Sequence, residues 1–246
     1  MSREPVISIA DESSTKKPRA FASSGLVLLL AGAMWLLGVL AAVGGVAYAV
    51  NGATQAKAYV TVPVQARAPA GLSVPTTARG DSASQVPLRP DAGNKIRLDI
   101  SGTERSNWLQ VGTDSLTLRS FDSTFAEQLL SRADVAVLGL SIGAGALLLR
   151  RLLLSIAEGE PFRPGNAARV AGIAGLTAGG SLAAAFSPAL GAGLVLERLG
   201  LDGAGSPVTT TFSLPVVPLL VALLLLALAE TFRRGTELAQ DVDGLV

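Results

Sequence analysis

The sequence predicts an all-α integral membrane protein: a bundle of four transmembrane helices with a small extracytoplasmic β-rich insertion between helices one and two. Three observations lead to this fold class. The chain of 246 residues is 49% hydrophobic and only 16% charged, whereas soluble domains are about 25% charged. Four long segments contain almost no charged residue. Between the first two of them, apolar and polar residues alternate as they do in half-buried strands.

Residues 24–50 form the first predicted transmembrane helix, because 25–50 contain no charged residue and about 20 apolar residues cross a bilayer. The basic residues at 16–19 and the Ala-Tyr-Ala sequence at 47–49 would also suit a signal peptide. A signal peptide has an apolar core of only about 7–15 residues, so an uncleaved helix is favoured. Residues 1–23 are expected to form a disordered cytoplasmic tail.

Three further apolar segments predict transmembrane helices at 133–158, 167–196 and 212–234. The helix over 133–158 would be about 39 Å long at 1.5 Å per residue, which exceeds a hydrocarbon core of about 30 Å. Its end, with Arg150 and Arg151, should therefore project beyond the membrane. Small residues allow close helix contact in lipid, and those of the first and third helices predict packing sites: Gly38, Gly45, Gly172, Gly175, Gly179 and Gly180.

The distribution of Lys and Arg predicts the orientation, because short cytoplasmic loops are enriched in basic residues. Basic residues precede the first span, lie between the second and third, and follow the fourth, whereas the loop over 197–211 holds only Arg198. This pattern predicts a multi-pass protein of the bacterial cell (plasma) membrane with both termini cytoplasmic. The turn at 159–166 and the tail at 235–246 would then be cytoplasmic, and the loop over 197–211 would lie outside.

Residues 51–132 form the predicted extracytoplasmic domain. Alternation in 58–66, 95–100, 108–112 and 115–121 indicates four or five short strands. The Pro-, Gly- and Ser-rich stretch at 69–93 is typical of a loop. It contains the tripeptide Arg-Gly-Asp at 79–81, but three residues recur by chance and an adhesion role is not favoured. Phe121, Phe125 and Leu129 are spaced by four and predict an amphipathic lead-in to the second helix.

The residue types disfavour several kinds of chemistry. The chain has no Cys and no His, which excludes disulfides, Cys/His metal sites and histidine acid–base catalysis. No ionisable residue is expected deep inside a span, where proton relays and transporters usually need one. Glu158 and Glu160 fit a solvated turn, and Glu197 and Arg198 fit an ordinary interfacial position. We therefore expect no enzyme activity, no cofactor and no metal site.

The segment "GEPFRPGN" should form a tight turn between the second and third helices. Gly159 is expected to take the left-handed conformation that ends a helix. Pro161 prevents the helix from continuing, and Pro164 suits the start of the next one. Asn166 is expected to cap the N–H groups of that helix, and Phe162 should pack on the helix ends.

The turn and the tail after the last span are expected to form one cytoplasmic unit, termed the clasp. Glu158 and Glu160 could pair with Arg233 and Arg234, while the rings of Phe162 and Phe232 meet. Such surface ion pairs stabilise by only about 0–1 kcal/mol, so the rings should contribute most of the stability. In the alternative, which the sequence favours almost equally, the arginines only anchor to anionic lipid head groups.

Two motifs carry a resemblance to a known family. A "GxPF…N" turn and an "FRRG…L" segment resemble the bacterial multipass membrane family DUF2975, a domain of unknown function, over 149–246. The resemblance implies a four-helix integral membrane protein without assigned activity, often paired with a small helix-turn-helix regulator encoded beside it. The matching residues are Gly159, Pro161, Phe162, Asn166, Phe232, Arg233, Arg234, Gly235 and Leu238.

The leading hypothesis is a non-enzymatic membrane protein that couples its outer domain to a cytoplasmic regulator. The alternative is an envelope structural or interaction protein that binds another membrane protein through its outer domain. Transport of small solutes or lipids ranks last, because the spans lack charged residues. The expected partners are the lipid bilayer and either a cytoplasmic helix-turn-helix regulator or another membrane protein. We expect no direct contact with nucleic acid, and the oligomeric state is left open.

Overall fold

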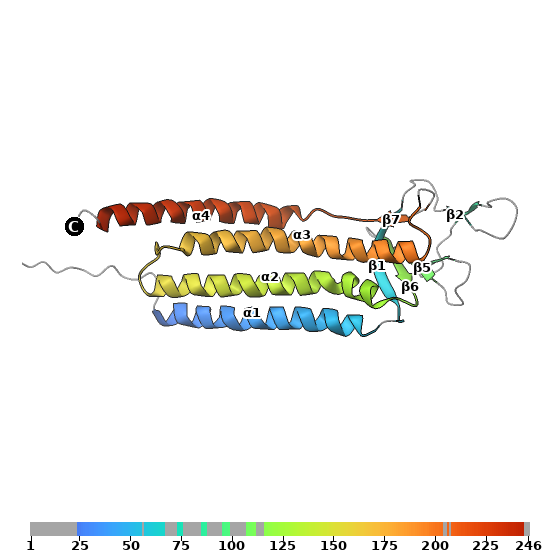
Figure 1. The fold of residues 1–246 in the computed structure, drawn as a ribbon, viewed down its shortest axis with the longest axis horizontal. Coiled ribbons are helices and arrows are strands. Elements are labelled where there is room, and N and C mark those ends of the chain that lie inside the picture. Colours follow the sequence, from blue (N-terminus) through green and yellow to red (C-terminus); the bar gives the residue numbers. More distant parts are fainter. Residues whose placement is uncertain are drawn as a thin grey trace, which may run out of the picture.

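Four long helices lie side by side, with a small β-sheet at one end (Figure 1). The computed structural model describes residues 24–55, 57–66, 73–75, 85–87, 95–98, 107–111, 116–203, 206 and 208–243. The predicted tail at 1–23 and the Arg-Gly-Asp tripeptide at 79–81 lie outside the described residues. The helices are α1 (Ser24–Ala53), α2 (Phe125–Ala157), α3 (Asn166–Arg198) and α4 (Val216–Asp243).

The four predicted helices form an open layer, an arrangement that we did not specify from the sequence. α1 packs on α2, α2 on α3 and α3 on α4, and helices that are not neighbours in this order make almost no contact within their described residues (Figure 1). A soluble protein would have to close such a layer in order to bury its apolar faces. In lipid this driving force is absent, because lipid tails are as apolar as the side chains.

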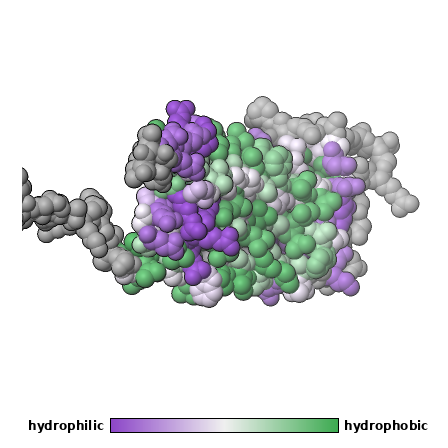
Figure 2. Space-filling view, turned by 60° about the vertical axis from the view of Figure 1, so that its left-hand side comes forward, coloured by the Kyte–Doolittle hydropathy of each residue, from purple (hydrophilic) through white to green (hydrophobic). Residues whose placement is uncertain are grey.

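All four helices are long and apolar enough to cross a membrane. Large apolar side chains remain exposed on them, for example Val217 and Leu224, each at 71% exposure. Figure 2 shows the hydrophobic surface over the middle of the helix layer and hydrophilic residues gathered toward the ends. A soluble monomer rarely exposes so continuous an apolar surface, so this is the surface of a multi-pass membrane protein.

Glycines bring α1 and α2 into close contact, as the sequence predicted for Gly38 and Gly45. A Cβ atom on Gly45 would lie only 2.6 Å from the carbonyl oxygen of Val135, and one on Gly38 would lie 2.8 Å from Cβ of Ala146. In α3 the prediction is half right. Gly172 and Gly180 face side chains of α2, whereas the Cβ positions of Gly175 and Gly179 have no atom within 4 Å.

The main sheet has five strands in the order β4-β5-β6-β1-β7, and every neighbouring pair is antiparallel. The short strands β2 (Ser73–Pro75) and β3 (Gln85–Pro87) pair separately, inside the stretch predicted as loop. The strands of the main sheet are β1 (Val60–Ala66), β4 (Lys95–Leu98), β5 (Asn107–Val111), β6 (Leu116–Ser120) and β7 (Val208–Thr210).

Strand β7 corrects the prediction that the β-rich part lies wholly between the first two helices. It belongs to the connection between α3 and α4, which we expected to be a loop, and it pairs with β1 over Val64–Ala66. An unpaired edge of β1 would expose a row of backbone donors and acceptors. β7 covers that edge and ties the α3–α4 connection to the sheet.

The sheet packs on the last turns of α3. One buried apolar cluster joins valines and leucines of the strands to four residues of α3 and its end. Because about 1.5–3 kcal/mol is gained for each large apolar side chain that is fully buried, this contact holds the sheet firmly on α3. The strand residues are Val60, Val62, Val64, Leu109, Leu118 and Val208, and the helix residues are Ala192, Val195, Leu196 and Leu199.

All four helices differ from their predicted bounds, α1 and α3 by only one to three residues and α2 and α4 by more. α2 begins at Phe125 instead of 133, so the expected lead-in and the span are one continuous helix. The cause is a capping box, in which Thr124 Oγ1 accepts from the N–H of Glu127 and the Glu127 carboxylate accepts from the N–H of Thr124. α4 begins at Val216 instead of 212 and continues past 234 to Asp243. Ion pairs between successive turns support this extension.

Candidate functional site

A buried ion pair joins α2, α3 and the sheet, and we call this place the junction. The carboxylate of Glu127, whose side chain is 2% exposed, accepts a hydrogen bond of 2.8 Å from Nε of Arg198. The other oxygen of Glu127 accepts from the N–H of Thr124 at 3.0 Å. The pair therefore connects the first turn of α2 to the last turn of α3.

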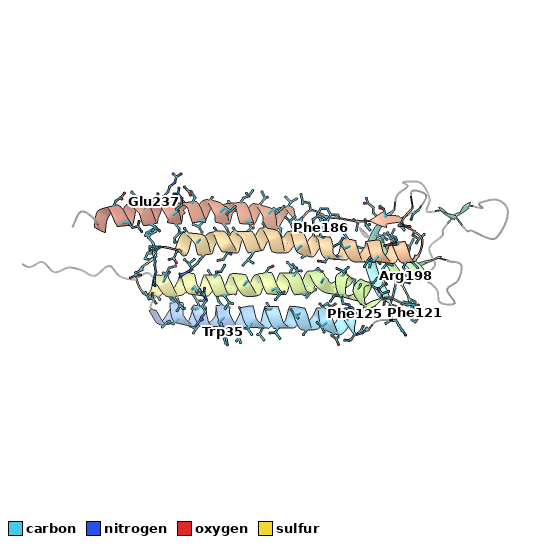
Figure 3. All side chains as sticks on the ribbon, viewed as in Figure 1. Trp35, Phe121, Phe125, Phe186, Arg198 and Glu237 are labelled. Atoms are coloured by element: carbon cyan, nitrogen blue, oxygen red, sulfur yellow. The ribbon has the colours of Figure 1, made fainter. Side chains whose placement is uncertain are left out.

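Arg198 also binds the end of β6. Its Nη2 donates to Oγ of Ser120 at 3.0 Å, and its Nη1 donates to the carbonyl oxygen of Phe121 at 3.3 Å. Figure 3 shows Arg198 at the sheet end of α3, close to Phe121. Because the guanidinium group is a rigid planar fork, these three bonds fix the sheet relative to both helices.

The neighbouring residue Gln128 connects α2 to the start of β1. Its side chain is fully buried, and its Nε2 donates to the carbonyl oxygen of Tyr59 at 3.1 Å and to Oγ of Ser123 at 2.8 Å. Ser123 in turn donates to the carbonyl oxygen of Ala58. Oε1 of Gln128 is a buried acceptor without a hydrogen-bond partner in the described part of the chain. Such an atom costs about 1–3 kcal/mol when it is left unsatisfied.

We did not predict the junction from the sequence, and we expected Arg198 to be an ordinary interfacial residue. Glu127 and Arg198 are 71 positions apart, so no local spacing connects them. The only available signal was the pattern Thr-x-x-Glu at 124–127, which is typical of a capping box. In the structure the glutamate serves both the cap and the ion pair.

At the other end of the layer, the turn after α2 meets the far part of α4. The rings of Phe162 and Phe232 lie 6.0 Å apart between centroids and are tilted by 49°. The Phe162 ring also covers Gly235, where a Cβ atom would lie 2.5 Å from the nearest ring carbon. Three of the predicted motif residues are therefore brought together, and Gly235 is needed because the ring of Phe162 occupies the space of a side chain.

Both places lie in a part of the chain that matches a known family model. Residues 125–246 match the model described as "Protein of unknown function (DUF2975)". The second half of this chain is a DUF2975 domain. No curated protein and no solved structure matches the chain. The DUF2975 domain contains Glu127, Arg198 and the clasp, whereas α1 and strands β1 to β6 precede it.

The charges of the clasp do not pair across the DUF2975 domain as we predicted. In the described part of the chain, Glu158 and Glu160 lie 3.2 and 3.9 Å from Arg163, within their own turn. Arg233 and Arg234 both bind Glu230 at 2.8 Å, within α4. The expected pairing between turn and tail is therefore wrong. The arginines of α4 have partners three or four positions away on their own helix, and the glutamates have Arg163 within their own turn. The interaction of the arginines with lipid stays a prediction.

Asn166 also differs from its predicted role. Gly165, with a φ of +98°, is the N-cap of α3, and Asn166 is the first residue of the helix. Its side chain is fully buried and donates from Nδ2 to Oγ of Ser155 at 2.8 Å and to the carbonyl oxygen of Pro161 at 2.9 Å. It thus ties the turn to α2 instead of capping α3. Gly159 has the expected left-handed conformation, with a φ of +84°.

The chemistry of the two places is that of fixed mechanical connections. The junction holds two helix ends and a sheet by directional, charge-assisted hydrogen bonds, and the clasp holds a turn and a helix by aromatic contact. Within the described residues there is no group of three or more His, Cys, Asp or Glu that could hold a metal ion.

Proposed function

We propose that this protein is a multi-pass membrane protein that passes a change in its outer sheet to a partner at its cytoplasmic end. The observation that carries the proposal is the ion pair between Glu127 and Arg198, which attaches the sheet to the ends of α2 and α3. A ligand or protein that moves the sheet would pull on these two helices directly. The proposed activity is a positional signal, without a chemical reaction.

The helices offer a stiff connection to the other end. α2 and α3 each contain 33 residues, which corresponds to about 50 Å at 1.5 Å per residue. Their far ends carry the turn that contacts α4 through Phe162 and Phe232. Helix shifts of about 1–2 Å are common in switching proteins, and a shift of this size would change the geometry of the clasp.

The proposed orientation rests on the position of the basic residues. Six arginines lie in or near the helix ends that are remote from the sheet, and Figure 1 shows these ends at the opposite side of the layer from the strands. Basic residues near span ends favour the cytoplasmic side, so the clasp is assigned to the cytoplasm and the sheet to the outside. The six are Arg150, Arg151, Arg163, Arg169, Arg233 and Arg234.

The clasp offers an apolar surface for a partner. Phe162 is 46% exposed and Leu238 is 67% exposed. Together with Phe232 and Gly235 they line a hollow of about 480 Å³. Such a hollow suits the apolar face of a small protein, and the kinship with DUF2975 suggests a helix-turn-helix regulator as that protein.

A single-cysteine reporter tests the coupling, because the chain has no cysteine of its own. Leu238→Cys is labelled with a maleimide in membranes, with and without Glu127→Gln. The proposal expects the labelling rate at 238 to change severalfold when the junction loses its charge. Asp202→Asn, the same chemical change at an exposed residue near the sheet, should leave the rate unchanged.

Arg198→Lys is a second junction variant, for the case that Glu127→Gln fails to fold. It keeps the positive charge but removes the guanidinium group that binds Ser120 and Phe121. Equal labelling rates in the wild type and in both folded junction variants would contradict the proposal.

A photo-cross-linking residue at Leu238 tests the identity of the partner. Capture of a helix-turn-helix regulator at 238 supports the proposal. Capture of another membrane protein by a second such residue at the exposed Gln65 of the sheet, with no capture at 238, would support the envelope-interaction alternative.

A further inference from the structure

A polar cavity of about 530 Å³ lies between the end of α1, strands β1 and β6, and the first turns of α2. Its lining includes two arginines, Arg119 and Arg132, and two tyrosines, Tyr48 and Tyr59. No carboxylate is among the described residues that line it. The two arginines and the two tyrosines bring N–H and O–H donors to the cavity, which suits an oxyanion.

The arginines are held in place before any ligand arrives. The guanidinium group of Arg119 lies 5.0 Å from the ring centre of Tyr59, and that of Arg132 lies 5.8 Å from the ring centre of Tyr48. Arg132 also fills the space that a side chain at position 52 would need, so Gly52 makes room for it. A guanidinium group that lies over a ring can still bind a phosphate through its N–H groups. Such preorganisation lowers the entropic cost of binding.

Arg132 takes part in none of the ion pairs found among the described residues. Its charge lies beside the fully buried Gln128, which also lines the cavity. Oε1 of Gln128 has no hydrogen-bond partner among the residues that the structure describes. The guanidinium group of Arg132 would bind an anionic group of a ligand, and Oε1 of Gln128 would accept a hydrogen bond from a donor group of the same ligand.

We propose that this cavity binds a phosphate ester that carries a neighbouring hydroxyl group. Arg119 and Arg132 bind the phosphate oxygens. Oε1 of Gln128 is buried in this structure, and a small rotation of its side chain brings it into the cavity, where it accepts from the hydroxyl group directly or through one water molecule. The glycerophosphate head group of an anionic lipid has this chemistry, and so does a soluble polyol phosphate.

The position of the cavity suits the lipid source. Tyr48 and Arg132 lie at the sheet-side ends of two candidate membrane spans, Gly25–Ala53 and Phe125–Ala157. Tyrosines gather at the level of lipid head groups at both membrane interfaces, and arginine binds phosphate groups through charge-assisted hydrogen bonds. The site itself does not depend on the proposed signalling function. If a ligand binds and the labelling rate at 238 stays the same, the site stands and the coupling fails.

The test uses the full-length protein in two arms. In the first, protein in detergent is titrated with sn-glycerol 3-phosphate, and the midpoint of thermal unfolding is followed. In the second, protein in nanodiscs of phosphatidylglycerol or phosphatidylcholine is released, and the retained lipid is identified by native mass spectrometry. Stabilisation in the first arm identifies a soluble ligand, and selective retention of phosphatidylglycerol in the second identifies a lipid.

Charge removal in the cavity should weaken the ligand that is found. We expect Arg132→Gln and Arg119→Gln each to reduce its affinity about tenfold or more, since a charge-assisted bond is lost. Arg132→Lys should retain part of the affinity, which separates charge from folding. Arg151→Gln makes the same change at the far end of α2, at an exposed residue outside the cavity, and should have no effect.

Two results would overturn the site. One is the absence of both stabilisation by glycerol phosphate and preference for phosphatidylglycerol. The other is unchanged binding in folded Arg132→Gln and Arg119→Gln proteins.

Discussion

The junction and the clasp both contain arginines and glutamates, yet they hold the chain together in opposite ways. At the junction, Arg198 bonds to a carboxylate with a 2% exposed side chain and to the end of a strand. At the clasp, Arg233 bonds to glutamates on its own exposed helix surface, and only the rings cross between elements in the described part of the chain. An ion pair therefore sets tertiary structure here only where its partner is buried.

The largest expected effect is at the junction. Glu127→Ala removes the carboxylate that pairs with the largely buried guanidinium group of Arg198. Breaking a buried pair costs about 3–5 kcal/mol, and because Arg198 is still 24% exposed we expect the lower end of that range. Denaturant unfolding in detergent measures the loss, with Asp202→Ala as the exposed control. A loss below about 1 kcal/mol, the value of a surface pair, would remove the distinction between the two places.

The next largest effect is expected at Gly235 in the clasp. Gly235→Leu forces the Phe162 ring away, because ring carbons already occupy the space of a Cβ atom. We expect a loss of about 2 kcal/mol, as for overpacked sites. The matched control is Gly32→Leu in α1, where the Cβ position has no neighbour within 4 Å. Equal stability of the two variants would show that the clasp is not packed in solution.

A smaller effect is expected for Phe162→Ala, which removes the ring contact with Phe232 but leaves Gly235 uncovered and unstrained. Aromatic pairs contribute about 0.5–1.5 kcal/mol, and because Phe162 is half exposed its remaining burial adds little. Phe125→Ala, a ring that is 58% exposed, is the control. If the two variants lose the same stability in unfolding experiments, the ring pair does not hold the turn on α4.

The smallest effect is expected for Arg233→Gln. Its bonds to Glu230 and Glu237 are exposed and lie within one helix, where each pair contributes about 0.3–0.5 kcal/mol. Arg198→Gln, the same change at the junction, should cost several times more. Comparable losses in parallel unfolding curves would contradict the difference in burial between the two places.

Features that depend on composition and on the local spacing of apolar and polar residues were predictable from the sequence. The four apolar helices, the close approach at Gly38 and Gly45, the strands β1, β4, β5 and β6, and the meeting of Phe162 with Phe232 all came from signals of this kind. The resemblance to DUF2975 was also confirmed, although the match begins at residue 125 rather than 149.

The features that escaped prediction depend on contacts between distant parts of the chain. Glu127 and Arg198 are separated by 71 positions, and β7 joins a sheet whose other strands all precede α2. The open layer escaped for a different reason. The sequence of an apolar helix in lipid does not indicate which face packs on a neighbouring helix, except where small residues lie, such as the glycines of α1 and α2.

The central claim is that the junction controls the geometry of the clasp at the opposite end of the helix layer. Cysteines at Phe162 and Phe232, in a chain that has none of its own, are joined in membranes by a short bis-maleimide cross-linker, and the rate is followed by gel electrophoresis. We predict that Glu127→Gln changes this rate severalfold, whereas Asp202→Asn leaves it as in the parent. An unchanged rate in a folded Glu127→Gln protein would show that the two ends are structurally independent, and would contradict the claim.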